Sequence, residues 1–131
     1  MTVVEADTIS RSLEVVVERA GDPAPQIYER LFAEFPETEA RFVRDVSGAI
    51  RAEMLTMVLD CLMHPGGLYQ NNLILAERVN HDGFGTDQAV FDRFFWIVRD
   101  VCRALAGPDW TADVDAAWTL RIKQITTASA A

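Results

Sequence analysis

Two histidines and two cysteines are the residues of this chain best suited to bind a metal or act as nucleophiles. His81 ends a weakly apolar helical segment, and Glu77 lies four residues before it. A neutral imidazole is a good metal ligand when an acceptor orients its second nitrogen. The backbone carbonyl or the carboxylate of Glu77 has the spacing to be that acceptor. A lone histidine at a helix end is more commonly a surface or capping residue, and this alternative stays open for His81.

The other three side chains indicate structural roles. His64 precedes Pro-Gly-Gly, a strong helix end, so we interpret it as a capping or solvent-exposed residue. Cys61 and Cys102 are far apart, each within an apolar helical pattern and outside any CxxC or Cys/His cluster. No zinc site is therefore indicated. Both cysteines are expected to be buried thiols, as in a reducing compartment.

The elements that must position these residues are all predicted to be helices. Apolar residues recur at helical spacing in seven segments that are separated by Gly, Pro or capping residues. These segments extend over 9–20, 23–35, 36–42, 50–62, 68–79, 87–105 and 112–125. The clearest amphipathic pattern lies between Val90 and Leu105. Few runs alternate with period two and none has a hairpin turn beside it, so the sequence predicts an all-α fold.

Length and composition fit one soluble domain. The chain has 131 residues, half of them apolar and about a quarter charged, and we expect a single domain over 1–131 with a flexible tail at 126–131. The net charge of −8 argues against binding to nucleic acid or to an anionic membrane surface. No apolar run approaches the roughly 20 residues that span a bilayer. The acidic N-terminus does not resemble a signal peptide, so a cytoplasmic location is expected.

Several short motifs lie at informative spacings. Tyr28 lies in the stretch Ile-Tyr-Glu-Arg-Leu-Phe, which is shortly followed by Phe-Pro-Glu. Phe42 comes fourteen residues after Tyr28. His81 begins a His-x-x-aromatic-Gly pattern with Phe84, and Phe91 comes ten residues after the histidine. Two further pairs stand near the C-terminus: Trp110-Thr111 and Ala117-Trp118.

In this order, the motifs resemble those of the bacterial single-domain globins and of the haem domain of flavohaemoglobins. The resemblance covers roughly Ile9 to Ile125 and implies a globin-like fold of about six to eight helices that holds haem b. It implies that His81 is the proximal ligand of the haem iron and that Tyr28 is a distal hydrogen-bond donor. The cofactor-binding residues that it implies are His81, Tyr28, Phe42, Ile50, Met54, Phe84 and Phe91.

The sequence also departs from this family. Ile50 stands where members usually carry glutamine or histidine, and Phe91 replaces the flavohaemoglobin tyrosine near the proximal histidine. No flavin or nicotinamide domain is expected, so a built-in electron supply is missing. Three cations near the expected haem pocket are candidates to bind the haem propionates, although each is also interpretable as a solvated surface charge. These cations are Arg44, Arg51 and Arg78.

Three functions follow from the resemblance. The first is a haem globin that reversibly binds a diatomic gas (O₂, NO or CO). The second is an enzyme, a nitric oxide dioxygenase or peroxidase-like globin that uses an external reductase. The third is a haem-free globin-fold regulatory or partner-binding module, which the apolar Ile50 and the Asn-rich segment before His81 favour. A homodimer through the apolar run Phe94-Phe95-Trp96 is a separate hypothesis.

Overall fold

The computed structural model describes residues 3–42, 45–64 and 88–130 of the chain. The α-helices in these residues are α1 (Val3–Ala20), α2 (Ala24–Glu34), α3 (Ala49–Met63), α5 (Gln88–Ala106) and α6 (Ala112–Ala130). Two 3-10 helices, η1 (Pro36–Phe42) and η3 (Gly107–Asp109), connect them. The predicted all-α fold is confirmed for the described residues. The predicted number of six to eight helices is not confirmed, because the described residues form five α-helices and the segment 68–79 lies outside them.

Capping residues set the helix boundaries much as the sequence indicates. Gly21 ends α1 with a φ of 75°, a left-handed conformation that glycine adopts without steric cost. The Asp22 carboxylate then accepts the backbone N–H of Ala24 at 2.9 Å, at the start of α2. The Thr111 hydroxyl accepts the N–H of Val114 at 3.3 Å and so caps α6.

Two helices are longer than the apolar periodicity predicts. The first helix begins at Val3, six residues before Ile9. Residues 126–130, which the sequence indicates to be a flexible tail, continue α6 as helical backbone to Ala130. The Thr126 hydroxyl donates to the carbonyl of Ile122 at 2.9 Å within this helix.

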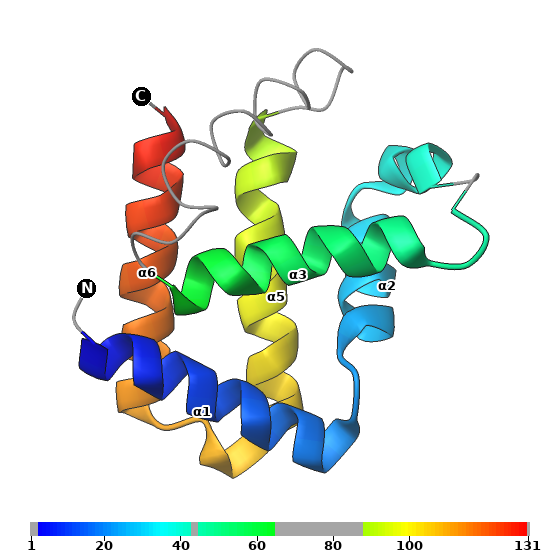
Figure 1. The fold of residues 1–131 in the computed structure, drawn as a ribbon. Helices are drawn as coiled ribbons and strands as arrows, with labels where there is room; N and C mark the ends of the chain where they lie inside the picture. The colour runs from blue at the N-terminus through cyan, green and yellow to red at the C-terminus, as the bar shows by residue number, and fades with distance from the viewer. Residues whose placement is uncertain (1–2, 43–44, 65–87, 131) are drawn as a thin grey trace.

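The helices form two crossing layers around one core (Figure 1). The α5 and α6 helices lie side by side and antiparallel, and α1 and α3 cross in front of them. The α2 helix packs against α5 and contacts α3. The core lies where these helices meet. Its largest fully buried apolar side chains are Trp118, Phe95, Ile9, Ile27, Leu62, Ile97, Ile122 and Ile125.

Two buried polar contacts connect α6 to the front layer. The Trp118 indole N–H donates to Oγ of Ser12 in α1 at 2.8 Å, and this hydroxyl donates to the carbonyl of Ile9 at 2.6 Å. The Arg121 guanidinium, only 1% exposed, donates from Nε and Nη2 to the carbonyl of Cys61 at 3.0 and 2.6 Å. These contacts fix α6 against α1 and against the last turn of α3.

Both cysteines are buried thiols, as predicted. Burial raises the pKa of Cys61 to about 11, against the opposing effect of the Arg121 charge. Burial alone raises the pKa of Cys102 to about 12. Because the thiolate is the nucleophile, the raised pKa values and the burial both disfavour reaction of these thiols at neutral pH.

The apolar run in α5 is mostly covered by the chain itself. Phe94 and Phe95 are buried, and Trp96 is half-buried with the Arg99 guanidinium 5.3 Å from its ring centroid. The run therefore gives no support to the homodimer hypothesis. None of the described helices is long and apolar enough to cross a membrane.

Candidate functional site

An aromatic cluster joins α2, η1 and α5 around Tyr28. The Tyr28 ring is buried, and its centroid lies 5.9 Å from that of Phe32, 5.6 Å from that of Phe42 and 5.7 Å from that of Phe94. Such separations are favourable for tilted and edge-to-face aromatic pairs. Two residues singled out in the sequence, Tyr28 and Phe42, are thus brought together.

The Tyr28 hydroxyl reaches across to α3. It donates to the backbone carbonyl of Arg51 at 2.8 Å, in the first turn of that helix. Burial raises the pKa of Tyr28 well above its usual range, although the Arg51 charge lowers it, and Asp45 raises it further. The phenol therefore stays protonated and remains a hydrogen-bond donor at physiological pH.

Asp45 organises the start of α3. Its buried carboxylate accepts the backbone N–H groups of Ile50 at 3.1 Å and of Arg51 at 3.0 Å. The Arg51 side chain donates from Nε to the same carboxylate and from Nη2 to the Asp45 carbonyl, both at 3.0 Å. Arg51, a candidate to bind a haem propionate, is thus already paired with Asp45. The other two candidates, Arg44 and Arg78, lie outside the described residues.

The capping role of Asp45 makes a testable prediction about pH. Desolvation would raise the pKa of Asp45, but the N–H donors of Ile50 and Arg51 and the Arg51 guanidinium outweigh it, so the pKa is lowered. A carboxyl with a lowered pKa in the folded state stabilises the fold above its unfolded pKa, and that stability is lost as pH falls through the folded pKa. We expect Asp45→Asn to be less stable than the wild type at pH 7. The difference should shrink below pH 4, as measured by urea denaturation; an unchanged difference would contradict this role.

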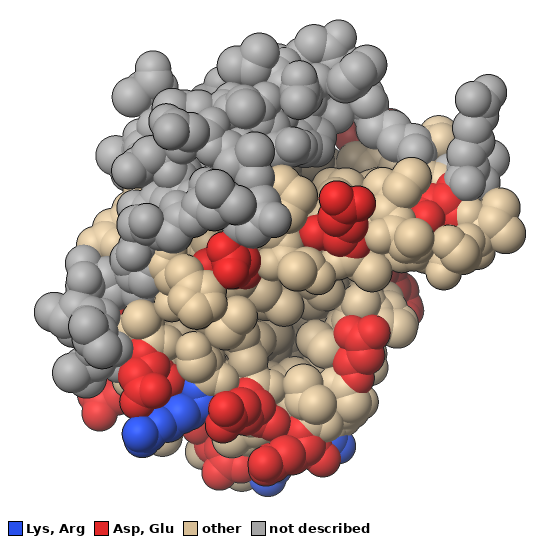
Figure 2. Space-filling view, viewed as in Figure 1, with Lys and Arg blue, Asp and Glu red and all other residues tan. Residues whose placement is uncertain are grey.

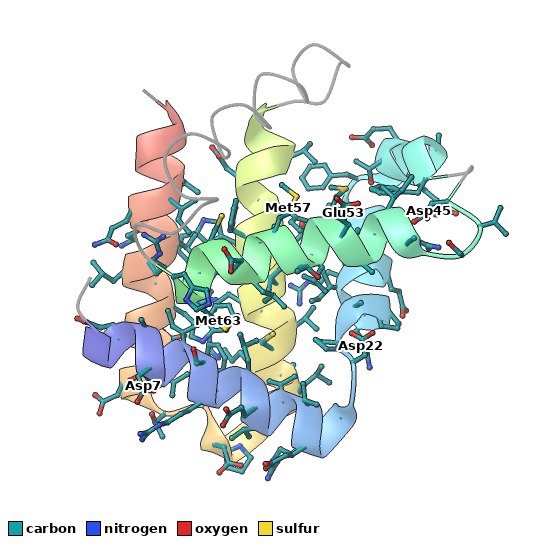
Figure 3. The ribbon with its side chains drawn as sticks, in the orientation of Figure 1. Asp7, Asp22, Asp45, Glu53, Met57 and Met63 are labelled. Atoms are coloured by element: carbon teal, nitrogen blue, oxygen red, sulfur yellow. The ribbon has the colours of Figure 1, made fainter. Side chains whose placement is uncertain are left out.

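The α3 helix presents apolar side chains on more than one side. Leu55, Val58 and Leu62 face the core and are buried. Ile50, Met54 and Met57 follow one another at helical spacing on a neighbouring side, which we call the outer α3 stripe. Ile50 is 53% exposed and the two methionines are half-buried. Figure 3 shows Met57 on the side of α3 away from α1. A helix that is apolar on several sides commonly has a second apolar surface to cover.

The remaining predicted residues are described only in part. His81 and Phe84 lie outside the described residues, and Phe91 belongs to α5 with its side chain outside them. His64 follows the last turn of α3 and is exposed, with Nε2 3.7 Å from a carboxylate oxygen of Asp60. This agrees with the capping or exposed role inferred for it. No group of three or more His, Cys, Asp or Glu side chains in the described ranges could hold a metal ion.

Sequence reasoning missed three side chains that shape this region. The sequence motifs single out neither Phe32 nor Phe94 as a partner of Tyr28, yet both contact its ring. Asp45 is not among the candidate residues that the sequence indicates, although an aspartate shortly before a helix is a known capping signal. Comparison of the chain with protein-family models, curated proteins and solved structures gave no significant match.

Proposed function

We propose that this chain is a haem-binding globin that reversibly binds a diatomic gas, with His81 as the axial ligand. The observation that supports the proposal is the pairing of Tyr28 with Phe42 beside α3, the helix that carries the outer α3 stripe. The resemblance assigns Tyr28, Phe42, Ile50 and Met54 to one region around a haem. A protonated phenol, an edge-to-face aromatic pair and an apolar helix side suit such a region, which needs an apolar lining with few polar groups.

The order and pairing of the helices are compatible with a globin-like fold, which is part of this proposal. The α2 helix packs on α5 and contacts α3, while α1 packs on α5 and α6. In the sequence, His81 lies between α3 and α5, after the helix that bears Ile50 and Met54. We further propose a cytoplasmic location, which the two buried thiols support.

The described residues fit a haem in polarity. The macrocycle is a large apolar disc, and Ile50, Met54 and Met57 provide an apolar surface that is incompletely covered by the described chain. When bound, haem would supply an iron that binds a diatomic gas. The imidazole of His81 would hold the iron, and the outer α3 stripe would exclude water. The Tyr28 hydroxyl now donates its hydrogen bond to the Arg51 carbonyl. To donate to a bound gas instead, it would have to release that carbonyl.

An absorption titration with haemin tests this function. We expect a sharp Soret band that saturates at one haem per chain in the wild type and in His64→Ala. His81→Ala should lose the band or shift it, since it removes the ligand, whereas His64 is an exposed residue after α3. The proposal fails if the wild type takes up no stoichiometric haem, or if His81→Ala gives the wild-type spectrum.

A second candidate is a haem-free partner-binding module of the same fold. Two observations favour it: the Tyr28 hydroxyl already has an acceptor, and Ile50 cannot hydrogen-bond to a bound gas. A purified protein that is colourless and does not take up added haemin would select this function over the first.

A further inference from the structure

A shallow groove of about 500 Å³ lies between α1 and α3. Its apolar wall comes from two pairs of residues one helical turn apart, Leu13 and Val17 on α1 and Leu59 and Met63 on α3. Leu13 is buried and closes the groove below, whereas Val17 is 57% exposed. Figure 3 shows Met63 where α3 ends beside α1. The groove therefore offers an accessible apolar surface about one helical turn long on each of the two helices.

The edge of this groove is acidic. Glu14 and Glu18 line it from α1, both are exposed, and they stand at i and i+4, a spacing at which like charges destabilise a helix. Figure 2 shows acidic side chains along both α1 and α3 on this face, with uncharged surface between them. An apolar floor beside the Glu14 and Glu18 carboxylates is complementary to a surface that is apolar along its centre and cationic along its edge.

We propose that this groove binds one face of a cationic amphipathic helix from a partner protein. The apolar side chains of that helix contact Val17, Leu59 and Met63, and its Lys or Arg side chains lie beside Glu14 and Glu18. This is the common mode in which an amphipathic helix lays its apolar face into a hydrophobic groove. Methionine suits such a surface because its unbranched side chain adapts to different shapes.

The charge of the groove favours this occupant over a second copy of the chain. Each copy carries a net charge of −8, and a symmetric contact would bring Glu14 and Glu18 of both copies together. The site is also separate from the proposed haem region. Leu59 and Met63 lie on one side of the core-facing residues of α3, and Met54 and Met57 on the other.

Fluorescence anisotropy with a labelled model peptide tests the proposal. The peptide has about four helical turns, with Leu along one face and Lys beside it, and a matched peptide carries Glu in place of Lys. The groove variant is Glu14→Lys with Glu18→Lys. The control is Glu29→Lys with Glu37→Lys, which makes the same change in net charge at exposed positions on α2 and η1. Circular dichroism checks that both double variants keep the helical fold.

We expect the Lys peptide to bind the wild type and the Glu peptide not to bind. The groove variant should weaken binding of the Lys peptide about tenfold, and the control less than twofold, because screening limits distant charges near physiological salt. Val17→Ser should weaken binding severalfold, because it removes apolar contact area from the groove without changing its charge. Absence of Lys-peptide binding, or equal weakening by the two double variants, would overturn the proposal. Sedimentation that shows a wild-type dimer lost in Glu14→Lys with Glu18→Lys would overturn it too, in favour of self-association.

Discussion

Replacement of Trp118 with alanine is expected to lower the free energy of unfolding by about 3–5 kcal/mol. Trp118 has no exposed surface and is the largest fully buried side chain of the described residues. Its ring centroid lies 5.2 Å from that of Trp110, so truncation removes this contact and leaves a cavity in the core. Such a loss is a large fraction of the 5–15 kcal/mol that typically stabilises a domain.

The polar edge of Trp118 adds to this effect. The Ser12 hydroxyl accepts the indole N–H and donates to the carbonyl of Ile9. Ser12→Ala leaves the indole N–H without this acceptor, and we expect it alone to cost about 1–3 kcal/mol. Urea denaturation followed by circular dichroism measures each loss. Trp96→Ala, at a half-buried position, is the matched control and should cost less. A loss below about 1 kcal/mol for Trp118→Ala would contradict the packing described here.

The second large effect is expected at Arg121. Its guanidinium is buried and makes two hydrogen bonds to the Cys61 carbonyl near the end of α3. The last carbonyls of a helix have no partner within the helix, so a buried one needs a donor from elsewhere. Burial lowers the pKa of Arg121, yet guanidinium groups stay charged in proteins. The side chain thus acts as a charged cap that α6 provides for α3.

Arg121→Met separates this hydrogen bonding from packing, because methionine keeps most of the hydrocarbon volume. We expect a loss of about 1–3 kcal/mol for the Cys61 carbonyl left without these donors. The relief of guanidinium desolvation keeps the loss from being larger. Lys123→Met, at an exposed position of the same helix, should change the urea midpoint little. An unchanged midpoint for Arg121→Met would mean that the contact does not stabilise α3.

Helical periodicity predicts the fold well where one side of a helix faces the core. The segment from Val90 to Leu105 is such a case, and its predicted apolar residues Phe94, Phe95 and Val98 are buried. The pattern is less informative in α3, where Ile50 belongs to the apolar series yet is half exposed. A helix that is apolar on several sides has no unique core direction, so the sequence alone does not orient it.

Long-range polar contacts are the part that the sequence does not predict. Arg121 is a charged residue beside Ile122, and no local pattern shows that it reaches Cys61 on another helix. Arg93 donates from Nε and Nη2 to the two carboxylate oxygens of Glu34, each at 3.0 Å, and so joins residues 59 positions apart. These partners depend on how the helices pack, which periodicity does not specify. Of the candidate site, the sequence indicated Tyr28 and Phe42, but not their contact or the Arg51 carbonyl that holds the phenol.

The central claim, that His81 is the axial ligand of a haem, is tested most directly by ligand rescue. Haemin is added to His81→Gly, and the absorption spectrum is recorded before and after addition of free imidazole. The account predicts a weak or shifted Soret band for the variant, and restoration of the wild-type band by imidazole at a concentration that leaves the wild-type spectrum unchanged. A His81→Gly protein that shows the wild-type band without imidazole would contradict the claim.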